Sequence, residues 1–309
     1  MDRRSPGVVI GLLVLAFEAF LATFTIVFII CVILRDFHKK KRLDTKDKIQ
    51  MALKVSSFIF TSVVTYNEFS NIVQPQFSKV CSRSPLYRVL IVYSMCSCSW
   101  LIAVQCFFYF IKIVHVKWIS SPWVRMNISS IVSWQIVLVK VISLCISLFD
   151  LISYKKAHVS SMNTSCISST NTTRGEMLVN DYVPLFILII VGAPLVLSII
   201  AISLNAAFLS CHMNKMKTTK TSGEVHQYKR IVFAMLRFLF LYFIFYVVMF
   251  LHYFSYFALY SIGYWLNLIL VLSFIPVLYI LQIRENPQWR ATCKEMTSYF
   301  THCGEPNTD

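Results

Sequence analysis

The segment Val89–Ile111, VLIVYSMCSCSWLIAVQCFFYFI, decides the fold of this chain. Its 23 residues include no charged residue and no His, Gly or Pro, and Arg88 and Lys112 stand at its two ends. A helix of this length measures about 34 Å, enough to cross a hydrocarbon core of about 30 Å. Small and polar residues recur within it, as expected for a helix that packs against other helices. The segment predicts a central membrane-spanning helix.

The composition places the whole chain in the membrane. The 309 residues are 57% hydrophobic and only 14% charged, with a mean hydropathy of +0.66. A single soluble core cannot hide so much apolar surface. The net charge of +15 mainly reports the connecting loops of a membrane protein, so we do not expect nucleic-acid binding.

The chemistry-bearing residues form no catalytic or metal-binding pattern. Half of the ten cysteines lie in apolar segments, where a thiol behaves as a small hydrophobe. The seven histidines lack paired metal-ligand spacing, and the chain has no phosphate-binding loop or nucleophile motif. The first apolar run is too long for a cleaved signal peptide. The sequence therefore predicts a protein that is not an enzyme and has no cofactor or metal.

Seven apolar segments predict an all-α bundle of seven membrane-spanning helices, forming a single domain with a short tail over residues 284–309. The segments are Val8–Leu34, Ile49–Ile72, Leu86–Ile113, Ile128–Asp150, Val183–Ser210, Ile231–Phe254 and Gly263–Ile283.

The Lys and Arg residues predict the orientation of the bundle. Seven of the 29 lie in the first connection, residues 35–48, and eleven more lie in the other connections and the tail on that side. The opposite side holds seven. Because basic residues favour the cytoplasmic side, we expect the amino terminus outside, the carboxyl terminus inside and a multi-pass protein of the plasma membrane.

The longest connection on the predicted outer side carries two glycosylation sequons. They begin at Asn163 and Asn171, in the segment SSMNTSCISSTNTT. Cys166 in the same connection and Cys81 before the third helix lie in an oxidising compartment, where a disulfide between them is one alternative. The other alternative is that both thiols are free.

A set of motifs near the predicted inner ends of the helices resembles the bitter taste receptors (taste receptor type 2), a branch of the G-protein-coupled receptors. The resemblance covers most of the chain. The matching residues are Glu18 and Asp36; Asp47-Lys48-Ile49; Ser99-Trp100-Leu101 and Ala103; Phe108-Tyr109-Phe110-Ile111-Lys112-Ile113; Trp123 and Arg125; Pro194, Leu197 and Ser198; His212 and Met216; and Gly223 and His226.

Some positions depart from the family pattern. The Gly-Asn pair of the first helix is Ala22-Thr23 here, and Ser57 replaces the basic residue of the second helix. Ile91 stands where the family often has a pocket Trp, and the seventh helix reads Pro276-Val-Leu-Tyr279 instead of carrying the His-Ser signature. The resemblance thus supports the inner machinery better than the pocket, and it implies a divergent member.

The resemblance implies that the inner ends of helices three, five and six receive the carboxyl-terminal helix of a G protein. For Tyr109 and Lys112 the residues alone favour an aromatic residue and a snorkelling lysine at the membrane edge, and the resemblance reverses this preference. The cationic connection after the fifth helix suits an amphipathic partner helix. The residues expected to bind the G protein are Tyr109, Lys112, His115, Lys117, His212, Lys215, Met216, His226 and Lys229.

The outer half of the bundle is expected to hold a small apolar agonist in an aromatic pocket. Glu68 and Arg88 face the vestibule as mutual partners or as ligand contacts, because charges within a membrane are functional hypotheses. For Lys54, snorkelling of the side chain to the inner membrane surface explains the buried charge almost as well as a functional role does. The expected ligand-binding residues are Glu68, Arg88, Ile91, Val92, Met95, Phe186, Tyr246, Phe250, Trp265 and Leu268.

The sequence therefore predicts a chemoreceptor that is embedded in membrane lipid and binds small, bitter-type molecules. The resemblance implies a heterotrimeric G protein with a gustducin or other inhibitory-class α subunit as partner, and leaves open a homo- or hetero-oligomer. One alternative is a receptor like the type 1 vomeronasal pheromone receptors. The other is a transporter or channel, against which the odd number of spans and the lack of an inverted repeat argue.

Overall fold

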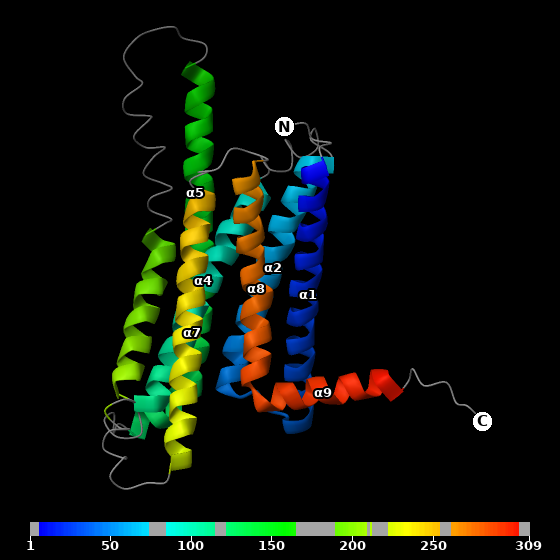
Figure 1. Ribbon diagram of the computed structural model, residues 1–309. Coiled ribbons are helices and arrows are strands. Elements are labelled where there is room, and N and C mark those ends of the chain that lie inside the picture. Colours follow the sequence, from blue (N-terminus) through cyan, green and yellow to red (C-terminus); the bar gives the residue numbers. More distant parts are fainter. Residues whose placement is uncertain are drawn as a thin grey trace, which may run out of the picture.

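The chain is helical throughout the residues that the computed structural model describes, with no strand among them (Figure 1). These residues are 6–73, 85–114, 122–164, 189–208, 211, 222–253 and 261–302. The helices are α1 (Pro6–Lys40), α2 (Thr45–Val73), α4 (Pro85–Val114), α5 (Pro122–Thr164), the helix Ile189–Phe208, α7 (Ser222–Tyr253), α8 (Ile262–Glu285) and α9 (Pro287–His302).

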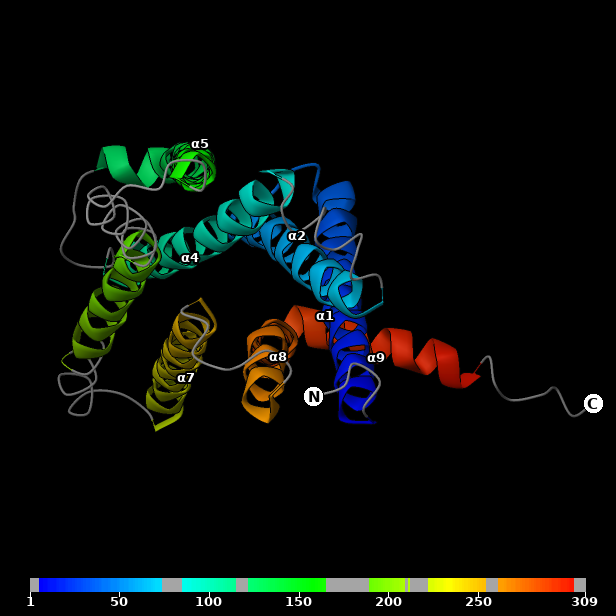
Figure 2. The ribbon, with the colours of Figure 1, turned by 90° about the horizontal axis from the view of Figure 1, so that it is seen from above.

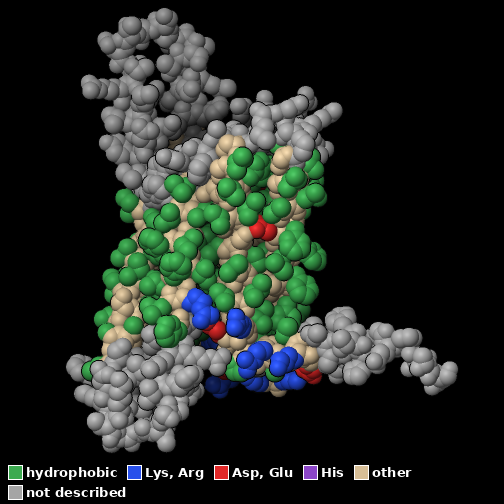
Figure 3. All heavy atoms as spheres, in the orientation of Figure 1, with side chains coloured by type: hydrophobic (Ala, Val, Ile, Leu, Met, Phe, Trp, Pro, Cys, Tyr) green, Lys and Arg blue, Asp and Glu red, His purple; other side chains and the backbone are tan. Residues whose placement is uncertain are grey.

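The apolar character of these helices confirms the predicted membrane bundle. Six described helices are long and apolar enough to cross a bilayer, and α7 adds a shorter apolar stretch, Leu236–Met249. Large apolar side chains cover the middle of the face in Figure 3, and Lys and Arg gather at one end of it. Phe17, Phe20 and Phe24 of α1 are each at least 60% exposed, as suits side chains that meet lipid.

Every predicted apolar segment is helical where it is described, and several of the helices run past the ends of their segments. The first helix continues to Lys40, and α5 extends from Pro122 to Thr164. The difference arises because hydrophobicity marks only the part of a helix that crosses the hydrocarbon core. Backbone hydrogen bonding continues into the polar flanks.

The helices pack around α2 and α8, as the view along the bundle shows (Figure 2). Helix α1 contacts α2 and α8, α4 contacts α2 and α5, and α7 contacts α8. The main core cluster joins these elements, with Ile26 and Ile29 of α1 and Leu268 and Val271 of α8 almost fully buried.

Two glycines allow neighbouring helices to approach closely, as small residues do between membrane helices. A Cβ atom at Gly11 of α1 would lie 2.6 Å from the ring of Trp265 on α8. A Cβ atom at Gly192 would collide with the hydroxyl of Tyr246 on α7. Any larger residue at either position must displace a packed aromatic side chain.

The predicted tail, residues 284–309, contains a helix, α9, that the sequence analysis does not predict. It begins at Pro287, directly after α8 ends at its cap Asn286, and it runs across the bundle instead of along it (Figures 1 and 2). Trp289 is 3% exposed within the main core cluster. The amphipathic pattern was missed because α9 is not hydrophobic overall.

The two ends of the bundle can be named from this arrangement. The α9 end is where α1 ends, α2 begins, α8 ends and α9 lies; the N-terminal end is where α1 begins (Figure 1). Arg35 of α1 donates to the Thr292 hydroxyl of α9 at 2.7 Å, which fastens α9 to α1.

Candidate functional site

A polar layer surrounds the ammonium group of Lys54, which is fully buried. Its Nζ donates to Gln282 Oε1 at 2.6 Å and lies 3.3 Å from the centre of the Tyr279 ring. The Tyr279 hydroxyl is 2.5 Å from Ser57 Oγ, and that serine is 3.6 Å from Cys98 Sγ. Lys54 therefore ties α2 to α8 and does not snorkel to the membrane edge.

A second lysine of the polar layer reaches in from α5. Lys140 donates to the hydroxyl of Ser97 at 2.8 Å and also to that of Ser56. The two serine oxygens are themselves 3.2 Å apart. Lys140 was not singled out from the sequence, although a lysine within an apolar run is the signal that finds such a residue.

The polar layer carries two cations whose described contacts are all neutral. Lys54 and Lys140 contact Gln282, serine hydroxyls and tyrosine rings, and neither lysine pairs with a carboxylate among the described residues. A buried cation is costly and is retained where hydrogen bonds compensate it. The layer thus links α2, α4, α5 and α8 through charge-assisted hydrogen bonds.

The N-terminal half of the bundle brings together most of the predicted ligand-binding residues. Val92, Met95, Trp265 and Leu268 are buried in the main core cluster. Ile91 and Tyr246 pack against it, partly buried. Phe186 lies outside the described residues, and for Phe250 the structure describes only its place in α7.

Several buried polar atoms of this half have no hydrogen-bond partner among the described residues. They are the indole Nε1 of Trp265 and the hydroxyls of Thr61 and Thr65. With Glu68, the two threonines follow the i, i+4, i+7 spacing of one helical face of α2. A buried donor left unpaired costs about 1–3 kcal/mol, so these atoms are suited to meeting polar groups of a bound molecule or of water.

Glu68 is buried at the N-terminal end, where its carboxylate accepts two hydrogen bonds. The Tyr264 hydroxyl of α8 lies 2.5 Å from Oε2, and the Asn67 side chain donates to Oε1 at 3.1 Å. The pair joins the last turns of α2 to the first turn of α8. The partner Tyr264 directly precedes Trp265 in the sequence.

Arg88 forms a two-point ion pair with Asp150, a residue that the predicted site does not include. Its Nε is 2.5 Å from Asp150 Oδ2, and its Nη2 is 2.9 Å from Oδ1. The Asp150 side chain is fully buried, and a third of the Arg88 side chain is exposed. The pair joins α4 to α5, which gives Arg88 a structural role besides the expected contact with a ligand.

The structure describes only some of the residues predicted to bind the G protein, which lie at the α9 end. Tyr109 packs beside Phe108, Ile49 and Val132 in a small apolar cluster of α2, α4 and α5. Lys112, His226 and Lys229 belong to helices, but their side chains are not described. His115, Lys117, His212, Lys215 and Met216 lie outside the described residues.

The predicted modifications fall at or beyond the edge of the described chain. Asn163 belongs to the last turn of α5, and its side chain is not described. Asn171, Cys81 and Cys166 lie outside the described residues. The glycosylation and the disulfide remain predictions.

Comparison with known proteins decides the family. The family described as "Taste receptor protein (TAS2R)" matches residues 4–301, nearly the whole chain. Taste receptor type 2 member 8 of Pongo pygmaeus is 24% identical over 228 residues, which cover 72% of this chain and 73% of that protein. The chain therefore belongs to the TAS2R taste receptor family and is a multi-pass membrane chemoreceptor of the G-protein-coupled class.

Proposed function

We propose that this protein is a plasma-membrane receptor that binds a small, largely apolar agonist in the N-terminal half of its bundle. The amino terminus lies outside the cell and the α9 end faces the cytoplasm, as the distribution of Lys and Arg indicates. The agonist must bind the active arrangement of helices more tightly than the resting one, because equal affinity shifts no equilibrium.

The unpaired indole Nε1 of Trp265 is the observation that carries the ligand site. It is a buried donor within an apolar and aromatic cluster that contains Met95 and Tyr246. Ligand sites combine such an apolar lining with a few placed polar groups. An acceptor on the agonist would pair with this donor, while the Glu68–Tyr264 pair lies at the same end of the bundle.

Replacing Glu68 with glutamine should change agonist potency and leave surface expression unchanged. Glutamine keeps an oxygen that accepts from the Tyr264 hydroxyl, so the contact between α2 and α8 survives while the negative charge is lost. Dose–response curves and cell-surface labelling measure the two effects. The matched control is Tyr264→Phe, which keeps the charge and removes the hydroxyl. Superimposable curves for wild type and Glu68→Gln would exclude Glu68 from the ligand site.

At the opposite end, we infer that a heterotrimeric G protein with a gustducin or other inhibitory-class α subunit docks against α4, the helix Ile189–Phe208 and α7. Its carboxyl-terminal helix would meet Tyr109, Lys112, His212 and Lys215. The positive charge of this end favours an amphipathic partner helix in a groove. The polar layer around Lys54 lies between the two sites and joins four of the helices.

Reversing the charge at Lys112 or His212 to glutamate should abolish signalling and leave agonist binding measurable. The expected cause is repulsion or loss of a contact at the G-protein site, far from the ligand. Agonist-stimulated nucleotide exchange on a co-expressed α subunit measures the effect. Lys155→Glu is the matched control, because it reverses an exposed charge near the other end of α5. Normal exchange in Lys112→Glu and His212→Glu would remove these residues from the site.

One experiment tests the function as a whole. A panel of bitter compounds should release calcium in cells that express this receptor together with the α subunit, and not without the subunit. Substrate uptake without a G protein would instead favour the transporter alternative, and a response confined to pheromones would favour the vomeronasal one. Epitope tags at the two chain ends test the orientation, since only the amino-terminal tag should stain in intact cells.

A further inference from the structure

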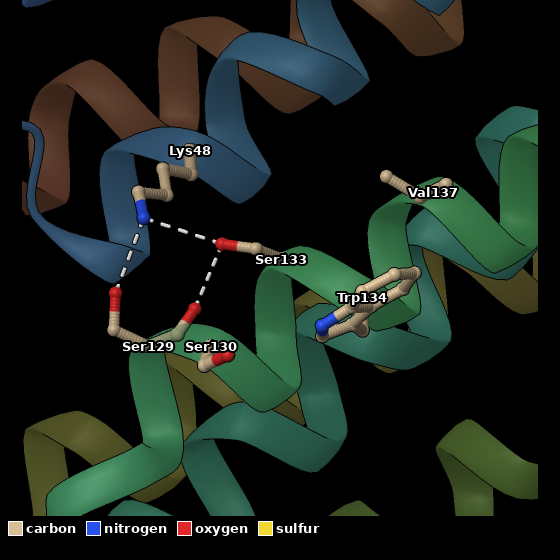
Figure 4. Close-up of a pocket in the computed structure, with 6 residues that line it drawn as sticks. All are labelled: Lys48, Ser129, Ser130, Ser133, Trp134 and Val137. Atoms are coloured by element: carbon tan, nitrogen blue, oxygen red, sulfur yellow. Dashed lines mark hydrogen bonds between the residues drawn. The ribbon is translucent and has the colours of Figure 1, made fainter.

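A groove of about 530 Å³ opens on the outer surface of α2 and α5, near the α9 end. It belongs to neither of the sites proposed above. One residue of α2, Lys48, and five residues of α5 form its walls (Figure 4). The five are Ser129, Ser130, Ser133, Trp134 and Val137.

The end of the groove nearest α9 is cationic and rich in hydroxyls. Lys48 Nζ lies 3.2 Å from both Ser129 Oγ and Ser133 Oγ, and Ser133 Oγ donates to the Ser129 carbonyl at 2.8 Å. Both partners of the ammonium are neutral, and an ammonium has three donors. The nearby carboxylate of Asp44 pairs with Lys40 instead. Among the described residues, Lys48 has no carboxylate partner.

The other end of the groove is apolar and open to the bilayer. Trp134 is 72% exposed and Val137 is 52% exposed. Val137 lies eight residues after Ser129 on α5, which is about 12 Å along a helix. Figure 4 shows Lys48 reaching from α2 toward the two serines, with Trp134 and Val137 farther along α5. The groove therefore changes from cationic to apolar along the direction in which a lipid is oriented.

We propose that this groove binds one anionic phospholipid. Its phosphate accepts hydrogen bonds from the Lys48 ammonium and from the Ser129 hydroxyl, and an acyl chain lies against Trp134 and Val137. Charge complementarity selects an anionic lipid over a zwitterionic one, because the described hydrogen-bond partners of Lys48 are neutral. An anionic lipid brings a net negative charge to this ammonium, whereas the choline cation of phosphatidylcholine offsets its phosphate. With the orientation proposed above, the site faces the cytoplasmic leaflet, where anionic lipids are concentrated.

Lipid selection by the purified full-length receptor tests the proposal. The receptor is incorporated into nanodiscs of phosphatidylcholine with a minor fraction of phosphatidylserine. It is then extracted into detergent, and the lipids that it retains are quantified by mass spectrometry. We expect wild type to retain phosphatidylserine selectively. Lys48→Gln should lose about fivefold of that enrichment, the effect of one cation at a membrane surface. Lys48→Arg should keep it.

A matched control and a second probe locate the lipid. Lys41→Gln removes an exposed cation from the connection between α1 and α2 and should leave the enrichment intact. Phosphatidylserine with brominated acyl chains should quench tryptophan fluorescence, and Trp134→Phe should remove that part of the quenching. The quenching requires no agonist and no G protein, so its failure leaves the proposed receptor function standing.

Four results would overturn the proposal. They are an unchanged enrichment in Lys48→Gln, an equal loss in Lys41→Gln, displacement of phosphatidylserine by a sterol, and inorganic phosphate competing as well as the lipid. The last result would mean that the groove binds free phosphate and not a membrane lipid.

Discussion

Replacing Asp150 with alanine should destabilise the receptor by roughly 3 kcal/mol, the low end of the cost of breaking a buried ion pair by removing one partner. The carboxylate is fully buried, and both of its oxygens accept from the Arg88 guanidinium. We take the low end because a third of the Arg88 side chain is exposed, where water screens the charge. The measurement is the midpoint of thermal unfolding of the detergent-solubilised receptor, together with surface expression.

Two further variants separate the ion pair from simple loss of packing. Asp150→Asn keeps the shape and loses the charge, and it should be nearly as destabilising as Asp150→Ala. The double variant Arg88→Leu/Asp150→Leu removes both charges and should recover part of the stability. If the destabilisation of the double variant equals or exceeds the sum of the destabilisations of the two single leucine variants, the pair does not act as a unit and the interpretation is wrong.

Changing Gln282 to glutamate should have opposite effects on stability depending on the residue at position 54. Beside Lys54, whose Nζ is 2.6 Å from Gln282 Oε1, the new carboxylate gains a cation that has no acidic partner among the described residues. The receptor should then become more stable. In a Lys54→Met background the same carboxylate is buried without a partner and should destabilise the receptor.

A double-mutant cycle of thermal stability measures the coupling between positions 54 and 282. We expect a coupling energy of about 3 kcal/mol, at the upper end for residues in one hydrogen-bonded network. Asn267→Asp is the matched control, because Asn267 is also buried on α8 and lies about four turns from Gln282. Its effect should not change sign when Lys54 is replaced. A coupling near zero would show that Lys54 and Gln282 do not interact in the folded receptor.

The sequence predicts the bundle because its strongest signal is hydrophobicity. The uncharged run Val89–Ile111 lies within α4. The helix itself is a few residues longer at each end and spans Pro85–Val114. Helix α9 escapes the same reasoning. Its apolar face is narrow, with Trp289 buried, and only its contact with α1 and α8 gives it a fixed place.

The partners of charged residues are what the sequence does not give. Glu68 and Arg88 were each predicted to lie near the ligand, as mutual partners or as ligand contacts. The structure brings Tyr264 to Glu68 and Asp150 to Arg88. Asp150 is 62 positions from Arg88, so only the packing of α4 against α5 brings them together. Helical periodicity gives the face of a residue, and helix packing gives its neighbour.

Near the N-terminal end, the sequence indicates the apolar neighbours more readily than the polar groups, while ligand binding there stays a prediction. Val92, Met95, Trp265 and Leu268 do share one core, because aromatic and aliphatic side chains on inward faces of adjacent helices must meet. The unpaired hydroxyls of Thr61 and Thr65 carry no such signal. Serine and threonine are common in membrane helices, where they usually bond to their own backbone.

Helix α1 is fastened to α8 and α9 at three heights along its length. Gly11 fits against Trp265, Glu18 accepts from Ser273, and Arg35 donates to Thr292. A helix held by contacts at three levels resists both tilting and rotation, so we expect α1, α8 and α9 to move together as one unit. We expect the movement that carries a signal to occur between α8 and α7, which meet through the stacked rings of Phe245 and Phe274, whose centres are 4.1 Å apart.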